Sequence, residues 1–333
     1  MPVPPDESRA FFEASSALSK HNLGDGSDGD GANPWIGPMP AIVEQARAQL
    51  SMSDRQAYFF AAKQFIKNGG VLIDAGTLAG GTSVALAAGA LSSGIRLPER
   101  PFLHAFDQFL CDWATPEFFM GNFGGKWKSG DNFRHIYEDV VKPFAQHIVI
   151  HEVDLTSPIK WEWGEIGVLG IDVWKTPEIA FSTSCMFFPH LKPGAVVLHQ
   201  DYQHIWLPWI HTMMEALSDY FDPIYYTRQG GTAVFSVKKR VSMEAIQQAI
   251  RIHDNPKDVE VLAERLLCKI SNKETSAFVK LARVIYRLKH FGPEAASTML
   301  NELTLPEFGD EMDDFFAGQR QTVADTIAYS QGR

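Results

Sequence analysis

Five short apolar segments, each followed by an aspartate, constrain the fold of this chain more than any other feature. They are VLID from residue 71, FLHAFD from 102, HIVIHEVD from 147, IGVLGID from 166 and AVVLHQD from 195, the last entered through a predicted turn, LKPG. Such segments, alternating with helical patterns, are typical of a parallel sheet covered on both faces. FDPIYYTR and GTAVFSV, joined at residues 229–231, predict a terminal antiparallel hairpin. We therefore predict an α/β fold with a Rossmann-like, doubly wound, mostly parallel sheet.

The pattern predicts three regions. Residues 1–50 form an N-terminal segment with a Gly/Asp-rich linker, residues 51–240 form the α/β domain, and residues 241–333 form an all-helical extension that is accessory or oligomerising. The linker, residues 21–33, suggests a calcium loop, but no glutamate closes the EF-hand spacing, so we interpret it as a mobile linker. Ser53 followed by Gln56 predicts a capping box at the start of the α/β domain.

Composition and charge exclude several classes of protein. The chain is 45% hydrophobic, which argues against disorder. Its net charge of −10 argues against nucleic-acid binding and against a polybasic membrane patch. No apolar run approaches the roughly 20 residues that span a bilayer, and the N-terminus lacks the order of a signal peptide. Three widely spaced cysteines indicate a reducing compartment. We expect a cytoplasmic enzyme that acts on a small molecule.

The aspartates that end the predicted strands indicate a ligand site. In open parallel sheets, ligands bind beyond the carboxyl ends of the strands. Five carboxylates at one edge repel each other unless a cation, ribose hydroxyls or backbone donors compensate them. A single aspartate there would be an ordinary helix cap, but five favour a ligand. They are Asp74, Asp107, Asp154, Asp172 and Asp201.

The loop after the first predicted strand, DAGTLAGGTS at residues 74–83, is the sharpest motif. Its glycines permit a tight turn and a close approach of the backbone to a ligand. The spacing G-x-x-x-G-G differs from the dinucleotide fingerprint G-x-G-x-x-G, and no lysine follows as in a phosphate loop. The loop therefore suits a nucleoside that carries no pyrophosphate.

These residues resemble motif I of class I S-adenosylmethionine (SAM)-dependent methyltransferases, and residues 106–109, FDQF, resemble the second-strand motif of that class. More narrowly, the chain resembles the macrocin O-methyltransferase-like group, which methylates sugar hydroxyls. Ile171-Asp172 matches the acid that ends the fourth strand in that group. The sequence HQDY at residues 199–202 resembles its acidic pair and tyrosine after the fifth strand. The resemblance covers residues 51–240.

The resemblance implies SAM as the cofactor and assigns residues to its parts. Asp107 would hold the ribose hydroxyls, and Asp154 would lie near the adenine. The residues assigned to the methionine part are Asp74, Gly76, Gly80, Gly81 and Thr82.

The resemblance also implies transfer of a methyl group to a hydroxyl of a sugar or glycosylated small molecule, in a homo-oligomer. Asp172, Gln200 and Asp201 would hold a divalent cation such as magnesium, and Asp172 would help to take the proton. The group commonly has two adjacent acids where this chain has Gln200 and Asp201, so a metal requirement stays open. Without metal, His199 or His204 would serve as the base.

Two other functions stay open. A non-catalytic SAM-binding subunit would use its helical extension to recruit a partner. A hydroxylase-like member of the same superfamily would need two histidines and a carboxylate on a redox metal, a set that the sequence does not offer. Residues 113–132, rich in glycine and aromatics, predict a lid over a sugar face or a surface segment packed by its own aromatics. Lys175 would pair with Asp172 or with an acceptor.

Overall fold

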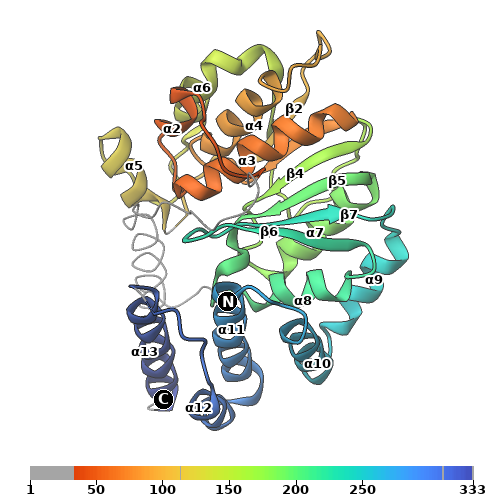
Figure 1. Cartoon of the computed structure of the whole chain (residues 1–333). Coiled ribbons are helices and arrows are strands. Elements are labelled where there is room, and N and C mark those ends of the chain that lie inside the picture. Colours follow the sequence, from red (N-terminus) through yellow and green to blue (C-terminus); the bar gives the residue numbers. More distant parts are fainter. Residues whose placement is uncertain (1–33, 113, 310, 332–333) are drawn as a thin grey trace. The chain divides into compact units, whose positions relative to one another are not determined.

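The computed structural model describes residues 34–112, 114–309 and 311–331, which divide into two units (Figure 1). The sheet unit contains the described residues up to Gln200 together with residues 220–242, and the helical unit contains residues 201–219 and 243–331. The predicted linker at 21–33 and the first residue of the predicted lid lie outside the described residues. A single boundary near residue 240 does not describe this division, because residues 201–219 pack with the C-terminal helices.

The sheet has seven strands in the order β3-β2-β1-β4-β5-β7-β6. β7 alone runs against the others, since it pairs antiparallel with both β5 and β6. This confirms the predicted mostly parallel sheet with its terminal hairpin. The predicted turn LKPG lies inside β5, because Leu191 already pairs with Ile166 of β4. The strands are β1 (Val71–Ala75), β2 (Leu103–Asp107), β3 (Ile148–Glu152), β4 (Ile166–Ile171), β5 (Leu191–His199), β6 (Phe221–Tyr226) and β7 (Ala233–Val237).

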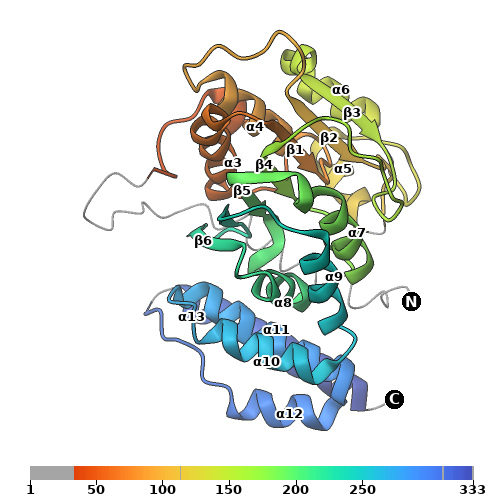
Figure 2. The ribbon, with the colours of Figure 1, turned by 90° about the vertical axis from the view of Figure 1, so that its right-hand side faces the viewer.

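Helices cover both faces of this sheet (Figure 2). α3, α4 and α6 lie on one face, where Leu103 and Ala105 of β2 join the main apolar core. Phe106 of the same strand points to the other face and contacts Phe187 of α7, as alternation along a strand requires. The helices of the unit are α2 (Ala41–Glu44), α3 (Met52–Phe65), α4 (Gly81–Leu91), α5 (Thr115–Phe123), α6 (Arg134–Val141) and α7 (Pro177–Phe187), with the 3-10 turns η1 (Ile66–Asn68), η2 (Lys142–His147) and η3 (Phe188–His190).

The capping box of α3 differs from the predicted one. Ser51 Oγ accepts a hydrogen bond from the N–H of Asp54, and the Asp54 carboxylate accepts one from the N–H of Ser51. Asp54 is 2% exposed, and its other oxygen accepts hydrogen bonds from Thr227, Gly231 and Thr232. The correct register places this carboxylate, rather than Gln56, where it joins α3 to the β6–β7 turn.

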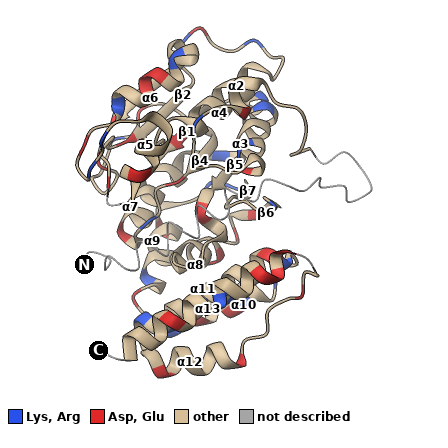
Figure 3. Ribbon diagram, turned by 90° about the vertical axis from the view of Figure 1, so that its left-hand side faces the viewer, with Lys and Arg blue, Asp and Glu red and all other residues tan. Residues whose placement is uncertain are grey.

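The helical unit confirms the predicted C-terminal helical extension. Its apolar core includes Ile205, Phe278, Leu281 and Phe316. Acidic and basic residues both lie on its helices (Figure 3), and the buried Glu215 pairs with Arg265 and Lys269. No helix in the described part of the chain is both long and apolar enough to cross a membrane. The helices are α8 (Pro208–Ala216), α9 (Met243–Ile252), α10 (Pro256–Leu267), α11 (Lys273–Phe291), α12 (Pro293–Glu302) and α13 (Glu311–Gln331).

A cluster of imidazole and indole rings covers β2 and β3 on the α7 side of the sheet. His104 Nδ1 lies 3.0 Å from His151 Nε2, so one ring donates a hydrogen bond to the other. His151 also stacks on Phe106 and contacts Trp163. Burial, followed by the nearby His151 and Arg100, lowers the pKa of His104 to about 4, and burial lowers the pKa of His151. The folded protein therefore holds both rings neutral at neutral pH.

We predict that this histidine pair makes the protein acid-sensitive. The unfolded chain takes up these protons near pH ~6.5, so the stabilisation is complete above that pH and is lost as the pH falls toward 4. In urea unfolding at pH 7.5 and 5, His104→Phe should lose less free energy of unfolding on acidification than the wild type. His135→Phe, which removes an exposed histidine stacked on Trp127, is the control. Equal acid losses in wild type and His104→Phe would contradict the prediction.

Candidate functional site

The chain reverses its direction of strand addition between β1 and β4, and the loops after these strands meet there. The N–H of Asp172 donates to the carbonyl of Ala75 at 2.8 Å. Gly76 has a φ of +88°, and a Cβ at this position would lie 2.5 Å from Val173 Cγ1. Glycine is thus required by both backbone conformation and space. This is the edge at which open α/β sheets bind ligands.

Asp107, at the end of β2, organises the loops that follow β1 and β2. Its carboxylate accepts hydrogen bonds from the N–H groups of Leu78, at 3.0 Å, and Phe109, at 2.8 Å. Both residues have left-handed backbone, with φ of 44° and 54°, a strained conformation for bulky side chains. Burial raises the pKa of Asp107, and these backbone hydrogen bonds oppose the shift. The half-buried carboxylate of Asp107 therefore bonds to two strained backbone positions, Leu78 and Phe109, beside the glycine loop.

Asp74 lies beneath the glycine loop, where its carboxylate bonds to the start of α4. It is 1% exposed and accepts hydrogen bonds from the hydroxyls of Thr82, at 2.7 Å, and Ser83. Ser83 also hydrogen-bonds to the hydroxyl of Tyr137 on α6. Because Thr82 has one hydroxyl proton, that proton is already engaged by Asp74. The hydrogen bonds from Thr82 and Ser83 to Asp74 thus fix the glycine loop to the end of β1.

Residues 48–50, just before α3, cover the glycine loop from the other side. Ala48, Gln49 and Leu50 line a cavity of about 20 Å³ together with Gly76, Thr77, Leu78, Ala79, Gly81, Thr82 and Asp172. A Cβ at Gly81 would lie only 2.2 Å from Ala48 Cβ. The structure therefore brings the predicted residues Gly76, Gly81, Thr82 and Asp172 together, while Gly80 packs on Tyr137 and Val141 of α6.

Arg55 of α3 holds this covering segment in place. Its Nη1 lies 2.6–3.1 Å from the carbonyl oxygens of Val43, Glu44 and Ala46, and its Nε lies 3.4 Å from that of Leu50. Sequence reasoning missed both Arg55 and the segment, because neither carries a local pattern. The S-x-x-D spacing of Ser51 and Asp54 is the one signal that could have located the start of α3.

Asp172, after β4, forms an ion pair with Lys175, whose Nζ lies 2.7 Å from Oδ1. This confirms one of the two interpretations of Lys175. Trp174, which lies between these two residues in the sequence, is buried. Its indole N–H donates a hydrogen bond to the hydroxyl of Thr183, and its ring contacts His199 with ring centroids 4.2 Å apart. His199 is 1% exposed and packs between Trp174 and Phe235. The predicted base His199 therefore lies in the packed interior of the sheet unit.

The predicted metal ligands are engaged separately. Gln200 is 7% exposed, and its Oε1 lies 2.8 Å from Thr232 Oγ1, which is also 2.7 Å from Asp54 Oδ1. Asp201 and His204 belong to the helical unit, where His204 Nδ1 accepts a hydrogen bond from the N–H of Trp206. Within the described ranges, no group of three or more His, Cys, Asp or Glu side chains could hold a metal ion. The magnesium site at Asp172, Gln200 and Asp201 therefore stays a prediction.

Two further predicted features, Asp154 and the lid segment, make their contacts with residues outside the glycine loop. Asp154 is exposed, and its carboxylate accepts hydrogen bonds from the N–H and hydroxyl of Thr156. The described part of the predicted lid contains α5, and its Phe119 contacts Phe133 and Trp127. The aromatics of this segment thus pack on one another, as the second interpretation of residues 113–132 predicted.

Comparisons with known proteins match this chain at the level of solved structures. No family model and no curated protein sequence matches it. The O-methyltransferase NovP is similar with a TM-score of 0.46 and 11% identity, over 70% of this chain and 100% of NovP. The SAH-bound Podospora anserina methyltransferase PaMTH1 is similar with a TM-score of 0.38 and 10% identity, over 72% and 98% of the respective chains. At this identity, the activity of neither protein transfers to this chain.

We predict that Asp74 weakens the fold as the pH rises. Burial raises the pKa of Asp74 to about 7 against the opposing bonds from Ser83 and Thr82. The folded state thus keeps a proton that the unfolded chain releases near pH ~3.9, so stability is lost as the pH rises toward and through 7. The free energy of unfolding of Asp74→Asn, relative to wild type, should therefore increase between pH 5 and 8. A constant difference would refute this, and Glu99→Gln, an exposed carboxylate, is the control.

Proposed function

We propose that this protein is a SAM-dependent O-methyltransferase. The observation that carries the proposal is the position of Asp107. Its carboxylate binds the strained backbone at Leu78 and Phe109, in the loops after β1 and β2, beside the glycine loop. A carboxylate in this place can accept hydrogen bonds from the two hydroxyls of a ribose. Asp107 ends β2 and Asp172 follows β4, which are the positions that the resemblance to class I methyltransferases implies for these acids.

The residues of the loop suit the rest of the cofactor. α4 begins at Gly81, and the first N–H groups of a helix favour a carboxylate such as that of methionine. Leu78 and Ala79 line the same cavity and offer apolar contact. Ala48 and Leu50 occupy much of the space above the loop, so binding requires that residues 48–50 move away from Gly81.

Asp172 is the proposed proton acceptor. When bound, SAM supplies a methyl group that its sulfonium already activates, so the protein must position an acceptor hydroxyl and receive its proton. Asp172 lines the glycine-loop cavity, and its side chain is 24% exposed. Lys175 stabilises the ionised carboxylate, and a proton that reaches Asp172 can leave to solvent.

The finer features of the prediction stay part of this proposal. A sugar hydroxyl as acceptor rests on the resemblance to the macrocin group, as does the homo-oligomer, whereas the cytoplasmic location rests on the three widely spaced cysteines. Magnesium assistance stays a prediction, and no step is assigned to it because Gln200 is engaged by Thr232 and Asp172 by Lys175.

The proposed function predicts that the protein binds S-adenosylhomocysteine, the product of the cofactor. Calorimetric titration of metal-stripped protein with S-adenosylhomocysteine should show micromolar binding, and repetition with magnesium tests the metal. Asp107→Asn keeps an oxygen for only one of the two loop N–H groups and removes the charge, so affinity should fall about 10–100-fold. Asp222→Asn, which changes a carboxylate of β6 paired with Lys238, should bind like wild type. If folded wild-type protein binds no S-adenosylhomocysteine with or without magnesium, the proposed function is wrong.

The second prediction separates an enzyme from a binding subunit. With methyl-labelled SAM and a panel of glycosides that carry free sugar hydroxyls, wild type should transfer label to at least one compound. Asp172→Ala should lower kcat about 10²–10⁴-fold while S-adenosylhomocysteine affinity and melting temperature stay near wild type. Retained transfer in Asp172→Ala would remove Asp172 from the mechanism. Cofactor binding without transfer to any glycoside would favour the non-catalytic subunit or another acceptor class.

A further inference from the structure

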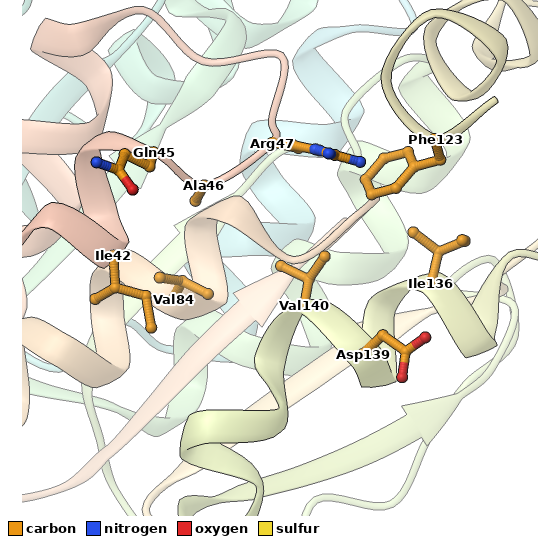
Figure 4. Close-up of a pocket in the computed structure, with 9 residues that line it drawn as sticks. All are labelled: Ile42, Gln45, Ala46, Arg47, Val84, Phe123, Ile136, Asp139 and Val140. Carbon is orange, nitrogen blue, oxygen red and sulfur yellow. The ribbon is translucent and has the colours of Figure 1, made fainter.

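We propose that a pocket beside the glycine loop is a second small-molecule site, which binds a monoanionic organic acid with an apolar body. The pocket has a volume of about 400 Å³, within the usual range for small-ligand sites. It lies between the end of α2, the first turn of α4, the end of α5 and one face of α6 (Figure 4). Its apolar lining consists of Ile42, Val84, Phe123, Ile136 and Val140.

Arg47 gives the pocket an oriented positive charge. Its Nη1 donates a hydrogen bond to the carbonyl of Asn122 at 2.6 Å, and its guanidinium lies 5.3 Å from the centre of the Phe123 ring. These two contacts hold the guanidinium of the exposed Arg47 beside Asn122 and Phe123, and its other N–H groups have no protein acceptor in the described part of the chain. A guanidinium held in this way can bind a carboxylate or sulfonate with little loss of side-chain entropy.

Asp139 limits how much negative charge the ligand can carry. It lines the pocket from α6, whereas Arg47 lines it from the segment after α2 (Figure 4). A second anionic group on the ligand would be repelled by this carboxylate, while a hydroxyl or amine could donate to it. The combination of apolar walls, one fixed cation and one carboxylate therefore favours a single anionic group on a largely apolar molecule.

The pocket and the glycine loop share a wall. Gln45, Ala46 and Arg47 line the pocket, and the next residues, Ala48 to Leu50, line the cavity over the glycine loop. Ala48 packs against Gly81, and Arg55 binds the carbonyls of Val43 and Ala46. An acid that binds Arg47 thus holds this wall against the glycine loop.

This coupling rests on the proposed function and gives it a regulator. Because residues 48–50 must move away from Gly81 to admit the cofactor, a ligand that holds them there lowers cofactor affinity. Linkage requires that the cofactor lower the affinity of the acid by the same factor. We therefore expect competition between two ligands that occupy different sites.

Two fluorescent probes with the same aromatic body test the pocket. 8-Anilinonaphthalene-1-sulfonate carries one negative charge, and N-phenyl-1-naphthylamine is its uncharged counterpart. The native protein should bind one equivalent of the sulfonate more tightly than the amine. Arg47→Gln should weaken the sulfonate about 10–100-fold and leave the amine unchanged, and Val140→Trp should weaken both by filling the pocket. Arg96→Gln, at an exposed arginine, is the charge-matched control.

Equal sulfonate affinity in wild type and Arg47→Gln, with both folded by circular dichroism, would overturn the site. The coupling is tested by titrating S-adenosylhomocysteine with and without saturating sulfonate. A rise in its Kd that disappears in Arg47→Gln supports the coupling, and an unchanged Kd overturns it. Failure of S-adenosylhomocysteine to bind even without probe would reject the proposed function, while the Arg47-dependent probe affinity would still decide the pocket.

Discussion

The close approach of the loop after β1 to the end of β4 is the constraint on which the site depends. The two strands are neighbours although the chain completes β2 and β3 between them, so their following loops diverge from one edge. The hydrogen bond from Asp172 to Ala75 brings them together, and Gly76 is the residue that allows it. Any side chain at Gly76 would push Asp172 away from the glycine loop, because the nearest atoms belong to Val173 and the Asp172 backbone.

The carboxylates at this edge are compensated one by one rather than by a shared cation. Asp74 is held by hydroxyls, Asp107 by backbone N–H groups, Asp154 by Thr156 and Asp172 by Lys175. The five aspartates at strand ends predicted a ligand site because their mutual repulsion needs compensation by a cation, ribose hydroxyls or backbone donors. Nearby protein donors meet part of this electrostatic requirement, and they come from the loops and helix starts at this edge, as when the N–H of Leu78 in the loop after β1 donates to Asp107 of β2. Asp107 remains the carboxylate with the clearest reason to face a ligand.

The sheet could be predicted from the sequence, whereas the environment of the site could not. Buried strands such as residues 71–75 and 166–171 are short and mostly apolar, so local pattern located them. The capping box was misplaced by two residues because Ser51 and Ser53 both suit an N-cap, and only the β6–β7 turn selects Asp54. Residues 115–117, Thr-Pro-Glu, carried a helix-start signal for α5 that the glycines and aromatics of the predicted lid obscured. The cover of Gly81 by Ala48 depends on tertiary packing and leaves no local signal.

The segment between α2 and α3 determines how the site can open. Arg55 engages carbonyl oxygens at the end of α2 and near the start of α3, so the segment is attached at both ends by one side chain. The hydrogen bonds of Arg55 do not depend on which side chains the segment carries, because their acceptors are backbone carbonyl oxygens, which every residue has. Within this segment, Ala48 packs against the glycine loop and Arg47 lines the pocket. Residues 45–47 line the pocket and residues 48–50 line the glycine-loop cavity, so the proposed coupling between the two sites runs through this one segment.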